Sequence, residues 1–388
     1  MVMAAGFSFA GELPIELGEK TPKVLKGNGE IVTARNACLS AITSDGGDVL
    51  SRIDVLLEYV GKILGLEVVE QTLEYEIVVA VVDAAFLEQE ISLEMLERAY
   101  GSPLAESAWE SSGGCLKRGV GLLQFVEQEH VRAFDSETRQ NLFKVINTLK
   151  LELQFLQQMS MVVLSLSKLR SKVYSGRRDA VLDFRDQDVA ELATNSLLYA
   201  KLVIGCYDTA MKCSTSCVVN KPLLSYLNCL TFLLMSLDQY SKDQCGVAVG
   251  MVEQAIRYLS QIVPADRLSD SILASRKKTD FLKNAIGKRT KNPRKTLRWI
   301  SRSRKEELIP VLALTLDDFV IPLSQLLRYR YRQMNEKLAY QKVESDEANL
   351  RKLFPRGKAP ELKGSQWFFN RETSRLQEAT GASTTGYY

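Results

Sequence analysis

Histidine is almost absent from this sequence: His130 is the single one among 388 residues. A Ser-His-Asp or Cys-His catalytic site would have to use it, and zinc or iron sites built from several imidazoles are disfavoured. His130 lies in the polar segment Gln128-Glu129-His130-Val131, which carries no catalytic motif. We therefore expect a solvated or helix-capping histidine.

Paired cysteine spacing is also missing. The seven cysteines are an odd number scattered along the chain, which predicts reduced thiols in the cytosol rather than a disulfide framework. Cys213 and Cys217 stand at helical i, i+4 spacing, but neither a second pair nor a histidine accompanies them. We expect both to be small buried side chains, and we expect no metal site.

No known catalytic motif is complete. Gly119 and Gly121 lack the Lys-Ser/Thr that follows in a phosphate-binding loop. Ser165 and Lys168 match the S-x-x-K motif of penicillin-recognising enzymes by letters only, because the companion K-T-G is missing. Asp317-Asp318 has no third carboxylate after it, so a polar stripe on a helix is expected there. The sequence predicts a protein that is not an enzyme and needs no cofactor.

Long hydrophobic runs are missing as well. The longest uncharged apolar run covers residues 222–237, which is too short to cross a bilayer and predicts a buried helix. Residues 1–14 have no basic start and contain Glu12, so no signal peptide is expected. These features predict a cytoplasmic protein whose contact with membranes is peripheral.

Helical periodicity fills most of the chain. Residues 49–66, for example, carry apolar side chains on one face at spacings of three and four. Turn residues separate such segments, which predicts an all-α protein of antiparallel helix hairpins in one domain, with a helical body over residues 34–338. Asn28-Gly29 between Val24-Leu25 and Ile31-Val32 predicts a small β-hairpin within residues 1–33.

The carboxy-terminal part of the body has one disturbance. A last long helix is expected from about Arg304 to Leu338, with a kink or short break near Ile321 because Pro322 lacks a backbone N–H. Hydrophobic pattern is lost after residue 370, so residues 371–388 are expected to be disordered.

Charge is unevenly distributed, although the net charge is only +3. Residues 44–130 carry 17 acidic against 5 basic side chains, whereas residues 276–305 carry 13 basic side chains and one acid. The second block predicts a recruitment surface for an acidic partner helix or an anionic membrane leaflet; a solvated face and, more remotely, a nucleic-acid site around Trp299 stay open. The predicted basic recruitment surface consists of Lys288, Arg289, Lys291, Arg294, Lys295 and Arg298.

Residues 330–362 carry the most specific pattern in the chain. A helix runs into Met334-Asn335-Glu336, followed by Ala339-Tyr340-Gln341-Lys342-Val343 and then by Phe354-Pro355-Arg356-Gly357-Lys358. This order resembles the end of Bro domains of Alix-like proteins, where an Asn-containing turn precedes F/Y-Q-x-V and P-x-G-K/R segments. Weaker similarities lie in residues 7–14, 74–90 and 115–127, whereas the AQAQE run of many members is replaced by other residues at 153–168.

The resemblance implies a fold and a partner. Bro domains are boomerang-shaped, with a TPR-like solenoid core and an extended tail, here residues 339–370, packed back on the helices. They are docking scaffolds without known chemistry and bind the carboxy-terminal amphipathic helix of the Snf-seven-type ESCRT-III subunit in a groove. Placing this chain on that pattern proposes four groove residues, Leu164, Leu166, Leu192 and Leu327. A further apolar groove position of the family is occupied here by Asp188.

The resemblance also implies a cellular role. The nearest similarity is to small fungal members that link ESCRT-III to alkaline-pH (Rim/Pal) signalling, so other proteins of that pathway are expected partners. Recruitment to endosomes or to signalling sites at the plasma membrane is then expected. The alternative is a general adaptor in endosomal cargo sorting, the multivesicular body pathway.

Overall fold

The computed structural model describes residues 22, 25, 27–43, 48–67, 70–102, 104–174, 186–213, 220–264, 268 and 308–379. Within them the chain is almost entirely helical, with one two-stranded sheet, so the all-α prediction is confirmed. The elements are α1 (Gly29–Thr43), α2 (Val49–Leu64), α3 (Gln71–Ala99), α4 (Glu106–Glu129), η2 (Val131–Ala133), α5 (Ser136–Tyr174), α6 (Asp186–Ala193), α7 (Ser196–Cys213), α8 (Lys221–Ser241), α9 (Cys245–Leu259), α13 (Pro310–Thr315), η7 (Leu316–Val320), α14 (Ile321–Met334), η8 (Asn335–Ala339), α15 (Glu347–Arg351), β1 (Trp367–Asn370) and β2 (Arg375–Glu378).

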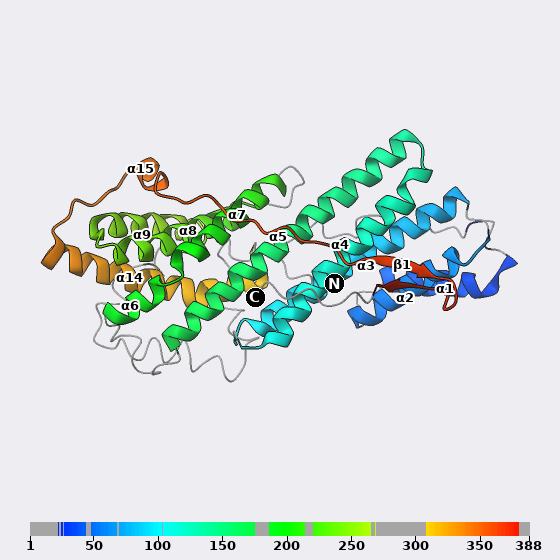
Figure 1. The fold of residues 1–388 in the computed structure, drawn as a ribbon, viewed down its shortest axis with the longest axis horizontal. Coiled ribbons are helices and arrows are strands. Elements are labelled where there is room, and N and C mark those ends of the chain that lie inside the picture. Colours follow the sequence, from blue (N-terminus) through cyan, green and yellow to red (C-terminus); the bar gives the residue numbers. More distant parts are fainter. Residues whose placement is uncertain are drawn as a thin grey trace.

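The helices form an elongated body (Figure 1). Helices α1 to α4 lie toward one end, α6 to α9 and α14 lie toward the other, and the long helix α5 extends between the two groups (Figure 1). Consecutive helices pack on each other, most extensively α3 with α4 and α8 with α9, because short connections favour antiparallel neighbours. Buried apolar residues from α1 to β2 form one contiguous cluster.

Two helices form the centre of this core. Residues 77–82 of α3 are all fully buried, and the apolar run 222–237 lies in α8, which is buried along almost its whole length. A helix that is apolar on every face has to be surrounded by other elements. The prediction that the run 222–237 is a buried helix is confirmed. Asn220 caps the start of α8, accepting a hydrogen bond from the Leu223 N–H at 2.9 Å.

The predicted hairpin within residues 1–33 is wrong where the structure describes it. Ile31 and Val32, expected in the second strand, lie in the first turn of α1. The Asn28 side chain accepts a hydrogen bond from the Ile31 N–H at 3.3 Å, as a helix-capping residue does. An Asn-Gly pair serves as a turn or as a helix start, and local sequence does not distinguish the two. Residues 1–21 lie outside the described part.

The last long helix is continuous from Pro310 to Ala339 but contains a π-helical turn at Leu316–Val320. The Ile321 N–H bonds to the Leu316 carbonyl, and Pro322 follows without an N–H of its own. At the place where a kink or short break was predicted, the helix therefore continues through a π turn. The helix is long and apolar enough to cross a membrane, but 67% of its apolar window is buried inside the protein. Core helices share that property, so it is weak evidence for a span.

After Ala339 the chain turns and returns across the helices as an extended strap, residues 340–366 (Figure 1). The strap contacts the helices at glycines, where no side chain holds it away. A Cβ built at Gly250 of α9 would lie 1.9 Å from the Glu344 carbonyl oxygen, and one at Gly121 of α4 would lie 2.1 Å from that of Ser365. Gly246 and Gly205 face the strap in the same way. Only glycine permits so close an approach of two backbones.

The strap ends in the hairpin of β1 and β2, antiparallel in the register Phe368↔Gln377. Residues 371–388 were expected to be disordered, and for residues 371–379 that expectation is wrong: they form the turn and second strand of this hairpin. Leu376 of β2 is buried in the core, and β2 packs on α2. This single buried anchor within a polar segment gives too weak an alternation to read as a strand.

Candidate functional site

The four leucines predicted to line a partner groove lie in the hydrophobic core. Leu327 is 0% exposed, Leu192 1% and Leu166 2%, so these three present no contact surface and that part of the prediction is wrong. Leu164 is also buried, at 8% exposed. Leucine at helical spacing is equally suited to a core and to a groove, so the sequence did not separate the two. The side chain of Asp188 is not among those described.

One face of α5 near these residues does reach the surface. Met161 and Lys168 are partly exposed, and with Leu164 between them they follow the i, i+3, i+7 spacing of a single helix face. Arg170, on the same helix, forms an ion pair with Asp318 of the π turn. This contact ties α5 to the last long helix. Asp318 thus belongs to an ion pair between helices.

The basic recruitment surface, Lys288, Arg289, Lys291, Arg294, Lys295 and Arg298, lies outside the described residues. Cys217 does too, while Cys213 is buried. Among the described residues no three His, Cys, Asp or Glu side chains gather closely enough to hold a metal ion. The Ser165 hydroxyl donates to the Met161 carbonyl at 2.8 Å, an ordinary bond within a helix.

Residues of the Met334–Val343 pattern build the turn from helix to strap. The Asn335 amide donates to the Gln341 carbonyl at 2.9 Å, and its Oδ1 accepts the Gln341 N–H at 3.0 Å. The Gln341 side chain in turn accepts the Gly246 N–H at 3.0 Å and donates to the Asp243 carbonyl at 2.7 Å. Between them Tyr340 takes the left-handed conformation, with φ 48°. This set of bonds, the Asn335–Gln341 lock, fixes where the strap starts.

The second half of the pattern fastens the strap farther along. The Lys358 N–H donates to the Lys201 carbonyl of α7 at 2.8 Å, where Gly357 faces Gly205. In α15, the Arg351 guanidinium donates to Asn228 Oδ1 and to the Tyr258 hydroxyl, both at 2.8 Å. These bonds join the strap to α7, α8 and α9.

Several ionisable groups are buried among helices α1, α2, α3 and α5. Arg35 pairs with Glu76 at 2.7 Å, and the Tyr59 hydroxyl donates to the same carboxylate. Asp83 is 0% exposed, neither of its oxygens has a partner among the described residues, and burial raises its pKa to about 8. Burial also raises the pKa of Glu152 to about 8. The Cys38 thiol lies near Asp83 and Glu76, but burial and these two carboxyl groups raise its pKa, which disfavours the nucleophilic thiolate. We therefore assign these groups to the packing of the core.

His130 is not solvated, in contrast to one expectation, but stands at the carboxy-terminal cap position of α4 and is buried, at 7% exposed. Its Nδ1 lies 2.5 Å from Glu74 Oε2, and its ring packs on Phe125 at 5.3 Å between centroids. Its Nε2 has no partner among the described residues.

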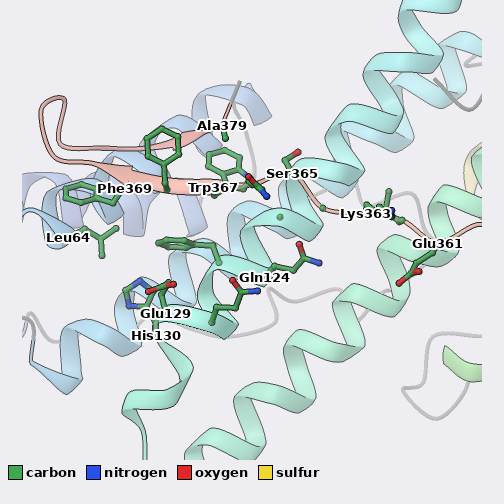
Figure 2. Close-up of a pocket in the computed structure, with 17 residues that line it drawn as sticks. Leu64, Gln124, Glu129, His130, Glu361, Lys363, Ser365, Trp367, Phe369 and Ala379 are labelled. Atoms are coloured by element: carbon green, nitrogen blue, oxygen red, sulfur yellow. The ribbon is translucent and has the colours of Figure 1, made fainter. Parts of the chain in front are cut away.

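His130 lines a pocket of about 760 Å³ between the end of α4, the end of α2 and strand β1 (Figure 2). Apolar side chains supply part of the wall, among them Leu64, Phe125, Trp367 and Phe369. Polar side chains supply the rest, among them Gln124, Gln128, Glu129, Glu361, Lys363 and Ser365. The Trp367 indole N–H is buried and, within the described residues, unpartnered. Sequence reasoning missed this pocket because its walls come from segments far apart in the chain.

Comparison with known proteins assigns the chain to a protein family. A family of unknown function (DUF5355) matches residues 71–388. The chain belongs to this family. It is also 38% identical over 376 residues to the uncharacterized protein YGR122W of Saccharomyces cerevisiae, covering 90% of this chain and 93% of that protein. The similarity thus extends over the helical body, the strap and the hairpin together.

Proposed function

We propose that this chain is a non-enzymatic adaptor of the Bro type, similar to the PalC proteins of fungal alkaline-pH signalling. In this role it binds the carboxy-terminal amphipathic helix of the Snf-seven-type ESCRT-III subunit and links it to the Rim/Pal pathway. The protein acts in the cytoplasm and joins endosomes or plasma-membrane sites through its partners.

The observation that carries the proposal is the Asn335–Gln341 lock. The residues on which the resemblance rests take part in bonds that turn the chain and lay the strap across the helices. Two-way bonding by Asn335 requires an amide at that position, since a carboxylate cannot donate. A short motif with such a geometric task supports a shared fold more strongly than matching letters do. The elongated helical body is consistent with a docking scaffold (Figure 1).

The structure changes where the partner helix is proposed to dock. Because Leu166, Leu192 and Leu327 are core residues, the docking face consists instead of the surface of α5 around Met161, Leu164 and Lys168. An amphipathic helix laid across this face would bury Met161 and place its own acidic side chains near Lys168. A few apolar anchors usually supply most of the affinity in this mode of binding.

The test is the affinity of a fluorescein-labelled ESCRT-III helix for the full chain, measured by anisotropy. Met161→Asp is expected to weaken binding by about tenfold or more, because a charge replaces an apolar anchor. The matched control is Leu151→Asp, since Leu151 is 38% exposed on the same helix about three turns away. Both variants should keep the wild-type circular dichroism. Equal affinity of Met161→Asp and wild type would remove this face from the proposal, and absence of binding by wild type would remove the partner.

A further inference from the structure

We propose that the pocket between α4 and β1 is a second binding site, which takes an extended peptide segment of a partner protein as an added strand along β1. The segment carries an apolar side chain flanked by Lys or Arg. This site shares no lining residue with the α5 face proposed to bind a helix, and the inference does not depend on that function.

The hydrogen-bond pattern of the hairpin leaves one edge of β1 unpaired. The Ala379 N–H donates to the Gln366 carbonyl at 2.8 Å, so these two residues form a hydrogen-bonded pair. Opposite residues alternate between bonded and non-bonded pairs in an antiparallel ladder. In the observed register Trp367 and Phe369 are therefore in non-bonded pairs, with their N–H and C=O groups directed away from β2. No hydrogen bond from the rest of the described chain reaches these groups.

This unpaired edge belongs to the pocket. Residues 366–369 line it, whereas from the other side of the hairpin only Ala379 does (Figure 2). An exposed strand edge is a template for another strand, and many proteins cover theirs. Here the edge is bordered by a hollow of about 760 Å³. Addition of an extended segment would pair the backbone groups of Trp367 and Phe369.

Two buried polar atoms in the pocket wall add a second, independent observation. His130 is only 7% exposed, and Glu74 accepts a hydrogen bond from its Nδ1, while its Nε2 has no partner among the described residues. The Trp367 indole N–H is a second buried polar group without a partner among the described residues. A peptide offers both an N–H and a C=O at every residue, so an added segment can supply an acceptor for the indole N–H and a partner of either kind for the imidazole nitrogen.

The side-chain preference follows from the wall. Leu64, Phe125 and Phe369 offer apolar surface for one side chain of the added strand. Glu129 and Glu361 are exposed on the rim against the single cation Lys363, so basic side chains on either side of the apolar one are favoured. An acidic segment would meet like charge.

The test uses short random peptides displayed on phage, selected against the full chain, and one enriched peptide labelled with fluorescein. Phe369→Pro removes the outward N–H, whereas Phe369→Val removes the ring and keeps the N–H, so the pair isolates the backbone bond. We expect enriched peptides with an apolar residue between Lys or Arg, bound about tenfold more weakly by Phe369→Pro than by Phe369→Val. Equal binding by the two variants overturns the proposal, as does the absence of any enriched peptide.

A second measurement covers the case in which Phe369→Pro does not fold. Bound peptide should slow hydrogen exchange at the amides of Trp367 and Phe369 in the wild-type chain, because it pairs them. Protection confined to other parts of the surface, or a peptide that binds as a helix, contradicts strand addition.

Discussion

Asp83 offers the sharpest test of the buried core, because a single atom changes between Asp83→Asn and wild type. The carboxyl lies in the middle of α3, fully buried, and no described group bonds to either oxygen. Burial is the largest influence on its pKa and raises it from 3.8 to about 8, while the charge of Arg52 opposes the increase. At neutral pH the native carboxyl is therefore mostly protonated.

The sign of the pH dependence follows from this increase. Between pH 3.8 and about 8 the native state holds a proton that the unfolded state has released, so stability falls as pH rises through this range. Below it both states are protonated, and above it both are ionised and the cost is complete. A tenfold change in proton affinity corresponds to about 1.4 kcal/mol, which sets an upper limit of roughly 6 kcal/mol. Relaxation and water entry reduce this value, so about 2–4 kcal/mol is expected.

The assay is urea unfolding of wild type and Asp83→Asn at pH 4, 7 and 9. The neutral amide has no charge to bury, so the variant should match wild type at pH 4 and exceed it by about 2–4 kcal/mol at pH 9. Glu94→Gln is the control, because Glu94 is exposed and pairs with Arg98 at the surface, a contact worth at most about 1 kcal/mol. A stability difference that does not change with pH would refute the reasoning.

Three further predictions concern the strap and the basic segment. Gly250→Ala should destabilise the protein and increase proteolysis within residues 340–366, because its Cβ would meet the Glu344 carbonyl. Gly114→Ala, whose Cβ would lie in ordinary contact with the Arg118 guanidinium at 3.8 Å, should instead stabilise by about 0.5–1 kcal/mol. Asn335→Ala should cost about 1–3 kcal/mol in urea unfolding, because the Gln341 backbone loses both partners; an unchanged midpoint would dismiss the lock. Reversal of Lys288, Arg289, Lys291, Arg294 and Lys295 to Glu should weaken helix and liposome binding at low salt and not at high salt, and equal binding at low salt would mark a solvated face.

The sequence predicted the helices well because their cause is local. Apolar spacing of three and four decides which residues face a core, and the uncharged run 222–237 could only be a buried helix. A disturbance of the last long helix near Ile321 followed from Pro322 alone. These features need no knowledge of distant segments.

Features set by distant segments could not be predicted in this way. Gly250 and Gly121 looked like ordinary helix glycines, because the strap that requires them lies far along the chain. The groove leucines failed for the same reason: whether Leu192 is covered depends on which elements pack over it. The pocket at His130 needed α2, α4 and β1 to be brought together. The hairpin predicted from Asn28-Gly29 was wrong for a different reason, since an Asn-Gly pair fits both a turn and a helix start.

The proposed function is tested most directly by deleting the gene in the organism that carries it and restoring it with variants. We predict failure of growth at alkaline pH with normal delivery of cargo to the vacuole, restored by wild type and by Leu151→Asp but not by Met161→Asp. Normal alkaline growth together with defective cargo delivery would contradict the account and favour a general sorting adaptor instead.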